Sequence, residues 1–328
     1  MTASNSNDPS IAGTPFARDI RQGLTHSPKK LSSRYFYDER GDRLFQAIMD
    51  MPEYYLTNCE YEILTTYRAR ICAPVLRRQP FEIVELGAGD GMKTRILLRH
   101  LLEMETDFCY RPIDISQNAL NGLEKALRQE MPRLRVQPLQ GEYFQVLKNL
   151  KESDLLPKLV LFLGANIGNL EREQAQNFLR QLRAALNPGD YLLIGFDLKK
   201  DPAVILNAYN DSAGITAEFN LNLLRRINRE LNADFDLQAF KHWESYNPAT
   251  GETKSYIVST RAQTVCIGLI GLEVEFGAWE AIDVELSLKY SRSEIEALAQ
   301  EAGFEPLETF SDARDYFVDS LWQAPETT

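Results

Sequence analysis

Residues 83–94 read IVELGAGDGMKT, an apolar stretch that runs directly into three glycines at alternate positions. Glycine adopts positive φ angles at little cost, so this run predicts a sharp turn at the end of a buried strand. The segment 92–102 that follows has the spacing of apolar residues expected of a helix. A strand, a glycine turn and a helix together indicate a βα unit of a parallel sheet that holds a ligand against the turn.

Strands and helices continue to alternate after this unit. The segment 159–164, LVLFLG, is apolar throughout, as expected for a central parallel strand buried on both faces. This alternation predicts an α/β fold with a doubly wound, Rossmann-like parallel sheet. Further strands are expected at 108–114, near 134–139 and at 190–198, and further helices at 116–129 and 171–186.

The alternation breaks at residues 199–286, which include a helix-rich stretch and then polar, strand-like segments. A helix and strand at 291–310 and a closing hairpin strand at 315–323 restore it. An interruption of this length predicts a second domain inserted into the α/β domain. Residues 1–17 are small, polar and proline-containing, and they are predicted to be a disordered N-terminus.

The composition narrows the class of function. A net charge of −11 argues against nucleic acid or an anionic membrane as a partner, because phosphate binding needs clustered Lys and Arg. No apolar run approaches the roughly 18 residues that span a bilayer. The N-terminus lacks the apolar core of a signal peptide, so we expect a cytoplasmic protein. The four cysteines, at 59, 72, 109 and 266, form no CxxC pair, so neither a zinc site nor a disulfide framework is expected.

Three ligand classes are candidates for the glycine turn. A P-loop would need glycine at position 92, where the chain has Met92. A nicotinamide site would need GxGxxG, whereas Gly87, Gly89 and Gly91 are spaced GxGxG. Glu85 before the turn would also repel a pyrophosphate and suits a cationic ligand. These differences favour the third class, a site for the sulfonium S-adenosylmethionine.

A second acidic residue supports this interpretation. Asp114 closes the next strand, where a carboxylate can accept hydrogen bonds from both ribose hydroxyls of an adenosyl group. The helix and hairpin after residue 291 end the chain as many methyltransferase sheets end. The alternative is a plain turn whose glycines serve only helix packing. We therefore predict a Rossmann-like class I methyltransferase sheet that uses S-adenosylmethionine and needs no metal.

The chain resembles the histidine Nα-methyltransferases of ergothioneine biosynthesis over nearly its whole ordered length. The long match AYND…FNLNLLRRINREL is specific to that family and falls inside the inserted segment. The resemblance is carried by YFYDERGDRLFQAIMDMPEYYLT (35–57), VELGAGDGMKTRILL (84–98), GANIGNL (164–170), DLKKDPAVILNAYNDSAGITAEFNLNLLRRINREL (197–231) and ELSLKYS (285–291).

The resemblance implies a two-domain enzyme that transfers methyl groups from S-adenosylmethionine to the α-amine of L-histidine, up to the trimethylated betaine. It implies a substrate domain built from the N-terminal segment plus the insertion, and a monomer that needs no protein partner. The domain boundaries expected on this basis are 62–196 plus 287–328 for the methyltransferase domain and 18–61 plus 197–286 for the substrate-binding domain.

Site residues carry over from the matching motifs. By resemblance, Tyr54, Asn169 and Tyr209 contact the amino acid, Glu285 and Ser287 hold the imidazole, and Tyr37 lies close to the reacting amine. Tyr37 and Asn169 are the expected catalytic residues. The residue types suit the chemistry, since an in-line methyl transfer mainly requires a neutral amine to be oriented. Cofactor contacts are implied at Gly87, Gly89, Lys93, Asp114, Glu142 and Tyr143.

Two positions depart from the family pattern. Asn166 stands where the family commonly has Ser or Thr. Ser255 stands where the family places Met near the substrate ring, so the wall of the ring site is more polar here. The sequence leaves open another aromatic substrate, such as tryptophan or tyrosine, and a reaction that stops at fewer methyl groups.

Other interpretations of these residues remain open from the sequence. Tyr54 and Tyr209 could be core aromatics, Asn169 a turn residue and Glu285 a solvated strand charge. The chain could also bind S-adenosylmethionine as a sensor without turnover, or methylate a protein or nucleic acid, which the acidic balance disfavours. The three histidines match nothing catalytic and are expected at the surface, at positions 26, 100 and 242.

Overall fold

The protein is described here by a computed structural model that covers residues 13–153 and 156–325. The chain divides into two compact units. Unit 1 contains the residues up to Tyr55 together with Lys200–Ser287, and unit 2 contains Leu56–Lys199 and the residues from Leu288 onward. The divisions therefore fall at 55/56, 199/200 and 287/288, compared with 61/62, 196/197 and 286/287 in the sequence analysis.

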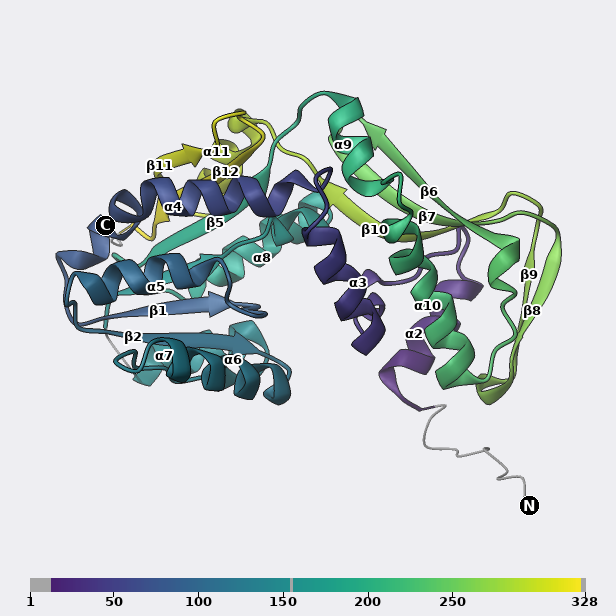
Figure 1. The fold of residues 1–328 in the computed structure, drawn as a ribbon, viewed down its shortest axis with the longest axis horizontal. Helices are drawn as coiled ribbons and strands as arrows, with labels where there is room; N and C mark the ends of the chain where they lie inside the picture. The colour runs from purple at the N-terminus through teal and green to yellow at the C-terminus, as the bar shows by residue number, and fades with distance from the viewer. Residues whose placement is uncertain (1–12, 154–155, 326–328) are drawn as a thin grey trace, which may run out of the picture. The chain divides into compact units, whose positions relative to one another are not determined.

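Unit 2 is built on a seven-stranded sheet with the order β11-β12-β5-β4-β1-β2-β3 (Figure 1). Strands β1 to β5 pair in parallel, while β12 pairs antiparallel to both β5 and β11. This sheet confirms the predicted Rossmann-like α/β class. The strands are β1 (Phe81–Leu86), β2 (Phe108–Asp114), β3 (Leu139–Gln140), β4 (Lys158–Phe162), β5 (Tyr191–Asp197), β11 (Glu305–Ser311) and β12 (Phe317–Gln323).

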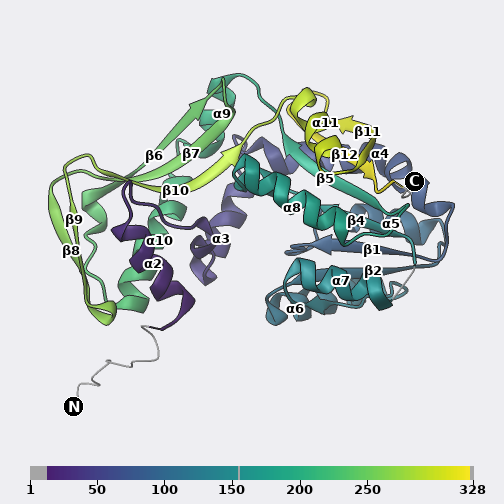
Figure 2. The same ribbon diagram turned by 180° about the vertical axis from the view of Figure 1, so that it is seen from behind.

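Helices cover both faces of this sheet. Figures 1 and 2 show α4 and α5 over one face and α8 and α11 over the other. Every residue of β1, β4 and β5 is buried, as expected for central parallel strands. The buried residues include charged ones, among them Glu82 and Glu85 of β1. The helices are α4 (Tyr55–Leu76), α5 (Thr94–Glu103), α6 (Gln117–Glu130), α7 (Tyr143–Ser153), α8 (Arg172–Ala184) and α11 (Arg292–Glu301), with a short 3-10 turn, η2 (Asn166–Asn169).

Unit 1 joins the N-terminal segment to the inserted segment around one core. Its three-stranded sheet has the order β10-β7-β6, and β8 and β9 form a separate hairpin. Phe36 from the N-terminal segment packs edge-on against Phe219 from the insertion, with ring centroids 5.0 Å apart. The elements are α2 (Pro15–Thr25), η1 (Ser33–Phe36), α3 (Glu39–Met49), α9 (Pro202–Tyr209), α10 (Ile215–Leu231), η3 (Leu237–Ala239), β6 (Phe240–Asn247), β7 (Glu252–Ser259), β8 (Gln263–Ile267), η4 (Gly268–Ile270), β9 (Leu272–Phe276) and β10 (Ala281–Leu288).

The strand expected near 134–139 is present in two short pieces. Val136 forms an isolated parallel bridge with Tyr110 of β2, and β3 covers Leu139–Gln140. Pro138 between them has no N–H to donate to a sheet.

One local prediction is wrong. The disordered N-terminus was predicted to reach residue 17, but α2 begins at Pro15, where the Thr14 hydroxyl accepts a hydrogen bond from the Ala17 N–H at 3.2 Å. Residues 1–12 of that prediction lie outside the described residues.

Within the described ranges, none of the helices is both long enough and apolar enough to cross a membrane.

Candidate functional site

The glycine turn lies at the carboxyl end of β1. Gly87, Gly89 and Gly91 have φ angles of 71°, 53° and 64°, a region that L side chains rarely adopt. A Cβ on Gly87 would lie 2.7 Å from the Tyr143 hydroxyl oxygen, whereas nothing lies within 4 Å of the equivalent position on Gly89. Gly87 is therefore needed for close packing, and Gly89 borders open space that a ligand can fill.

The other predicted cofactor residues in this part of the sheet follow β2 and β3. Asp114 ends β2, and its side chain accepts a hydrogen bond from the Ser116 N–H at 2.8 Å. The Gly141 N–H donates to the Asp114 carbonyl at 3.1 Å, which holds Glu142 and Tyr143 beside the end of β2. Burial raises the pKa of Tyr143 to about 12, so it remains a neutral hydroxyl.

This arrangement fits S-adenosylmethionine. The carboxyl ends of β1, β2 and β3 meet at one edge of the sheet, where open α/β sheets bind ligands. That edge offers an uncrowded glycine, a carboxylate at Asp114 and an exposed carboxylate at Glu142. The residues could hold an adenosyl group by its ribose and its base.

Lys93 belongs to a buried charged cluster that the sequence analysis missed. Its ammonium forms an ion pair with Glu60, whose side chain is 1% exposed. The other Glu60 oxygen accepts from the Gly164 N–H at 2.7 Å, just past the end of β4. Asp319 of β12 is fully buried beside this pair. Burial and, next, the charge of Glu60 raise the pKa of Asp319 well above its usual value. The only sequence signal was an acidic residue among the apolar positions of α4.

Glu85 lies beneath the glycine turn. The Thr94 hydroxyl donates to one of its oxygens at 2.6 Å, and the Tyr110 hydroxyl bonds the other. These bonds tie β1 to the start of α5 and to β2, so Glu85 supports the turn from below. Burial raises its pKa from 4.5 to about 7, more than the two hydrogen bonds lower it.

Glu85→Gln is expected to remove a pH dependence of stability. The pKa of the Glu85 carboxyl is higher in the folded protein than in the unfolded chain. As the pH rises, the unfolded chain therefore loses the Glu85 proton before the folded protein does. The contribution of Glu85 to the free energy of unfolding is fully present below about pH 4.5. It is lost as the pH rises toward 7, and the total decrease is about 3 kcal/mol. Urea unfolding at pH 5 and pH 8 checks this difference. An equal pH dependence in the wild type and the variant would contradict it.

Asn169 is the last residue of η2, which follows β4 in unit 2. Ala165 precedes this turn with a positive φ of 55°, and the Asn166 amide donates to the Leu163 carbonyl at 2.9 Å. Both Asn166 and Asn169 are exposed. Gly168 between them cannot carry a side chain, because a Cβ there would lie 2.8 Å from the Leu288 carbonyl oxygen. The turn thus holds the Asn169 side chain outward at the carboxyl edge of the sheet.

Unit 1 brings together three of the predicted substrate residues. Tyr209 ends α9, and its hydroxyl lies 3.0 Å from the Ser287 hydroxyl of β10, in hydrogen-bond contact. Tyr54, just before α4, packs edge-on against the Tyr209 ring with a centroid distance of 6.3 Å. Two aromatic residues and a hydroxyl that are far apart in the sequence thus form one group.

Tyr37 and Glu285 lie beside this group in the same unit. The Tyr37 ring packs edge-on against Phe45 and Phe219, at 5.6 and 5.5 Å, and the side chain is partly exposed. Partial burial of its hydroxyl and then the charge of Glu285 raise the pKa of Tyr37 above its usual value. Tyr37 is therefore a protonated hydroxyl at neutral pH, close enough to Glu285 to sense its charge.

Ser255 contacts two carboxylates, one of which the sequence analysis missed. Its hydroxyl donates to Glu244 Oε2 at 2.6 Å and lies 3.4 Å from Glu285 Oε2. Glu244 is directly opposite Ser255 in the pairing of β6 with β7, and its side chain is 1% exposed. The one sign of it in the sequence is a charged residue at an inward position of a strand.

His242 corrects the expectation of a surface histidine. Its side chain is 2% exposed, and its Nε2 donates to the Tyr209 carbonyl at 3.0 Å, since a carbonyl oxygen only accepts. Burial lowers the pKa of His242, which keeps it neutral near pH 7. Its ring therefore helps to fix the end of α9, where Tyr209 lies.

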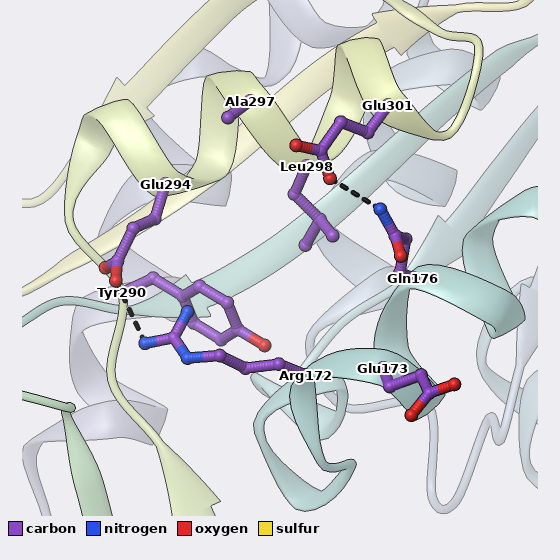
Figure 3. Close-up of a pocket in the computed structure, with 8 residues that line it drawn as sticks. All are labelled: Arg172, Glu173, Gln176, Tyr290, Glu294, Ala297, Leu298 and Glu301. Carbon is purple, nitrogen blue, oxygen red and sulfur yellow. Dashed lines mark hydrogen bonds and ion pairs between the residues drawn. The ribbon is translucent and has the colours of Figure 1, made fainter.

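A separate surface pocket of about 410 Å³ lies between α8 and α11 of unit 2 (Figure 3). Arg172 spans its edge, bonded to Glu294 at 2.9 Å, and Gln176 is bonded to Glu301. Its lining residues include none of the predicted site residues. In the part of the chain that the structure describes, no group of three or more His, Cys, Asp or Glu side chains is arranged to hold a metal ion.

Comparison with known proteins adds the family. The sequence profile of a family described as "Histidine-specific methyltransferase, SAM-dependent" matches residues 16–324. The "Histidine N-alpha-methyltransferase" of Mycolicibacterium smegmatis is 37% identical over 310 residues, covering 94% of this chain and 95% of that protein. "Ergothioneine biosynthesis protein 1" of Neurospora crassa is 33% identical over 303 residues, covering 90% of this chain and 33% of that protein. The "L-tryptophan methyltransferase trpM" of Psilocybe serbica is 26% identical over 320 residues, covering 90% of this chain and 89% of that protein.

Proposed function

Because the chain belongs to the family of histidine-specific, S-adenosylmethionine-dependent methyltransferases, we propose that it methylates the α-amine of L-histidine, up to the trimethylated betaine. The observation that carries this proposal is the grouping of Tyr37, Tyr54, Tyr209, Glu285 and Ser287 in unit 1. Tyr37 was predicted as a catalytic residue close to the reacting amine and the other four as substrate contacts, from motifs spread over more than two hundred positions.

The side chains of unit 1 suit an amino acid with a polar ring. Glu285 and Ser287 are two residues apart on β10, so they face the same side of the strand and can bond two ring nitrogens. The Tyr209 hydroxyl fixes the Ser287 hydroxyl, and Tyr54 packs against the Tyr209 ring. A site with such groups rejects a ring that cannot pair with them.

The reacting amine must be neutral and correctly directed. S-adenosylmethionine supplies the methyl group as an electrophilic carbon on a sulfonium. Tyr37 keeps its proton at neutral pH, so its hydroxyl can orient the amine by hydrogen bonding without adding charge. On this proposal Asn169 of unit 2 donates its amide N–H to the substrate carboxylate. Gly87, Gly89, Asp114, Glu142 and Tyr143 hold the cofactor, with Lys93 paired to Glu60 beside them.

We expect the protein to act as a cytoplasmic monomer, without nucleic acid or membrane as a partner. The net charge of −11 supports the absence of phosphate-rich partners. Light scattering on the purified protein tests the oligomeric state directly.

The reaction is tested by mass spectrometry of the products formed from S-adenosylmethionine and each of the twenty amino acids. A gain of three methyl groups on histidine alone is the expected result. Methyl groups derived from a deuterated cofactor distinguish the product from contaminants. Methylation of tryptophan or tyrosine would assign a different substrate. Fewer than three methyl groups on histidine would show that the reaction stops before the betaine. Cofactor binding with no product from any amino acid would favour a sensor.

A further inference from the structure

An ion pair in unit 2 connects helix α4 with the cofactor edge of the sheet. Glu60 projects from α4 with its side chain 1% exposed, whereas its partner Lys93, between the glycine turn and α5, has a side chain that is 23% exposed. Burial lowers the pKa of Lys93, but the charge of Glu60 and their hydrogen bond outweigh it, so the pKa is raised and Lys93 stays a cation. Glu60 is closed off from a ligand, while the Lys93 ammonium can reach one.

Glu60 also holds the loop that follows β4. One of its carboxylate oxygens accepts a hydrogen bond from the Gly164 N–H at 2.7 Å, and the other accepts from Lys93. A Cβ on Gly164 would lie 3.3 Å from the Lys93 Nζ atom, so the ammonium lies against this loop. The loop continues into η2, whose last residue is Asn169. One carboxylate therefore fixes both the cation and the start of this loop at the carboxyl edge of the sheet.

The sheet leaves space for the Glu60 carboxylate. A Cβ on Gly195 of β5 would lie 2.6 Å from Glu60 Oε1, so a side chain there would displace the carboxylate. Asp319 of β12 is directly opposite Gly195 in the sheet and is fully buried. Burial and, next, the charge of Glu60 raise the pKa of Asp319 well above its usual value, which favours the neutral acid. With Asp319 neutral, its charge does not add to that of Glu60, so the cluster with Lys93 does not repel an anionic group of a ligand.

The predicted cofactor residues lie on two sides of the glycine turn. Asp114 ends β2, and Glu142 follows β3, where they suit the ribose and the base. Lys93 lies against the loop after β4, and β4 is the neighbour of β1 on the side away from β2. The carboxylate at the aminoacyl end of S-adenosylmethionine is the one anionic group of this cofactor, and it is the group that an ammonium binds most strongly.

We propose that Glu60 is a positioning residue for the reaction: it holds the Lys93 ammonium where this cation meets the carboxylate at the aminoacyl end of S-adenosylmethionine. This inference rests on the proposed function in one respect, namely that Lys93 belongs to the cofactor site. An ammonium has three N–H donors, so the bond to Glu60 leaves donors for the ligand. Because Glu60 already orders the long Lys93 side chain, less rotamer freedom is lost when the cofactor binds.

The test compares S-adenosylhomocysteine with 5′-methylthioadenosine, which has the same adenosine and thioether sulfur but lacks the aminoacyl end. By calorimetric titration, the wild type is expected to bind S-adenosylhomocysteine at least about tenfold more tightly, since only this compound brings a carboxylate to Lys93. Glu60→Gln is expected to weaken S-adenosylhomocysteine binding by about fivefold or more and to change the affinity for 5′-methylthioadenosine by less than about twofold. A general loss of structure would weaken both.

A second buried carboxylate of unit 2 provides the matched control. Asp190 accepts the backbone N–H groups of Asn187 and Lys158 at 2.8 and 2.9 Å, just before β5 and therefore at the opposite edge of the sheet. Asp190→Asn is expected to leave the preference between the two ligands unchanged. A double-mutant cycle adds a second readout, because Glu60→Gln together with Lys93→Met should lose no more affinity for S-adenosylhomocysteine than Lys93→Met alone.

The outcomes separate this inference from the proposed function. If Lys93→Met binds S-adenosylhomocysteine as the wild type does, Lys93 does not belong to the cofactor site and that part of the proposed function fails. If Lys93→Met weakens binding but Glu60→Gln does not, or if Glu60→Gln weakens both ligands equally, the role of Glu60 is overturned while the proposed function stands. Thermal unfolding establishes that each variant is folded.

Glu60→Asp decides the question if Glu60→Gln does not fold. This variant keeps the negative charge but is one methylene shorter, so it cannot hold Lys93 and the Gly164 N–H in the same place. A selective loss of affinity for S-adenosylhomocysteine supports the positioning role. An unchanged preference, or an equal loss for both ligands, overturns it.

Discussion

Glu285→Ala is expected to lower kcat/KM for histidine by at least about 100-fold while the affinity for S-adenosylmethionine stays unchanged. The carboxylate lies on β10 of unit 1, in reach of Ser255 and close to Tyr37, whereas the glycine turn lies in unit 2. Removing it deletes a charge-assisted hydrogen bond to the ring and leaves neighbouring polar groups unpaired. Steady-state kinetics with histidine and calorimetric titration with the cofactor measure the two quantities.

Glu273→Ala provides the matched control for this change. Glu273 is exposed on β9 of the same unit and has no place in the proposed site, so its loss should leave both quantities unchanged. An equal loss of cofactor affinity in Glu285→Ala would mean that Glu285 does not act on the substrate side chain. Unchanged kinetics would remove Glu285 from the site altogether.

Gly87→Ala is expected to weaken S-adenosylmethionine binding by at least about tenfold, because the turn must rearrange. The residue has a φ of 71°, which costs an L side chain about 1–2 kcal/mol, and its Cβ would lie 2.7 Å from the Tyr143 hydroxyl. Both effects displace groups at the carboxyl edge of the sheet. Calorimetric titration with the cofactor, alongside thermal unfolding, separates weaker binding from a general loss of stability.

Gly122→Ala is the corresponding control in unit 2. Gly122 lies within α6, and nothing lies within 4 Å of its Cβ position. Alanine there should stabilise the helix by about 0.5–1 kcal/mol and leave cofactor binding unchanged. Wild-type affinity in Gly87→Ala would show that the glycine turn is not part of the cofactor site.

The sequence alone determined the features that depend on neighbouring residues. The mostly apolar segments of β1, β4 and β5, the glycine turn and the amphipathic helices are local patterns, so the parallel sheet could be predicted from them. The break at residue 199 indicated the inserted segment for the same reason. The interruption of the strand expected at 134–139 also has a local cause, because Pro138 has no N–H to donate to the sheet.

The tertiary structure decided which distant residues meet. Glu244, Ser255 and Glu285 come together because the register of β6 on β7 and the place of β10 in the sheet align them, and that alignment follows from the packing of the whole unit. The burial of Glu60, Asp319 and His242 likewise follows from long-range packing. A charged residue in a strand or helix reads as exposed in the sequence, since only the surrounding core determines whether it is removed from water.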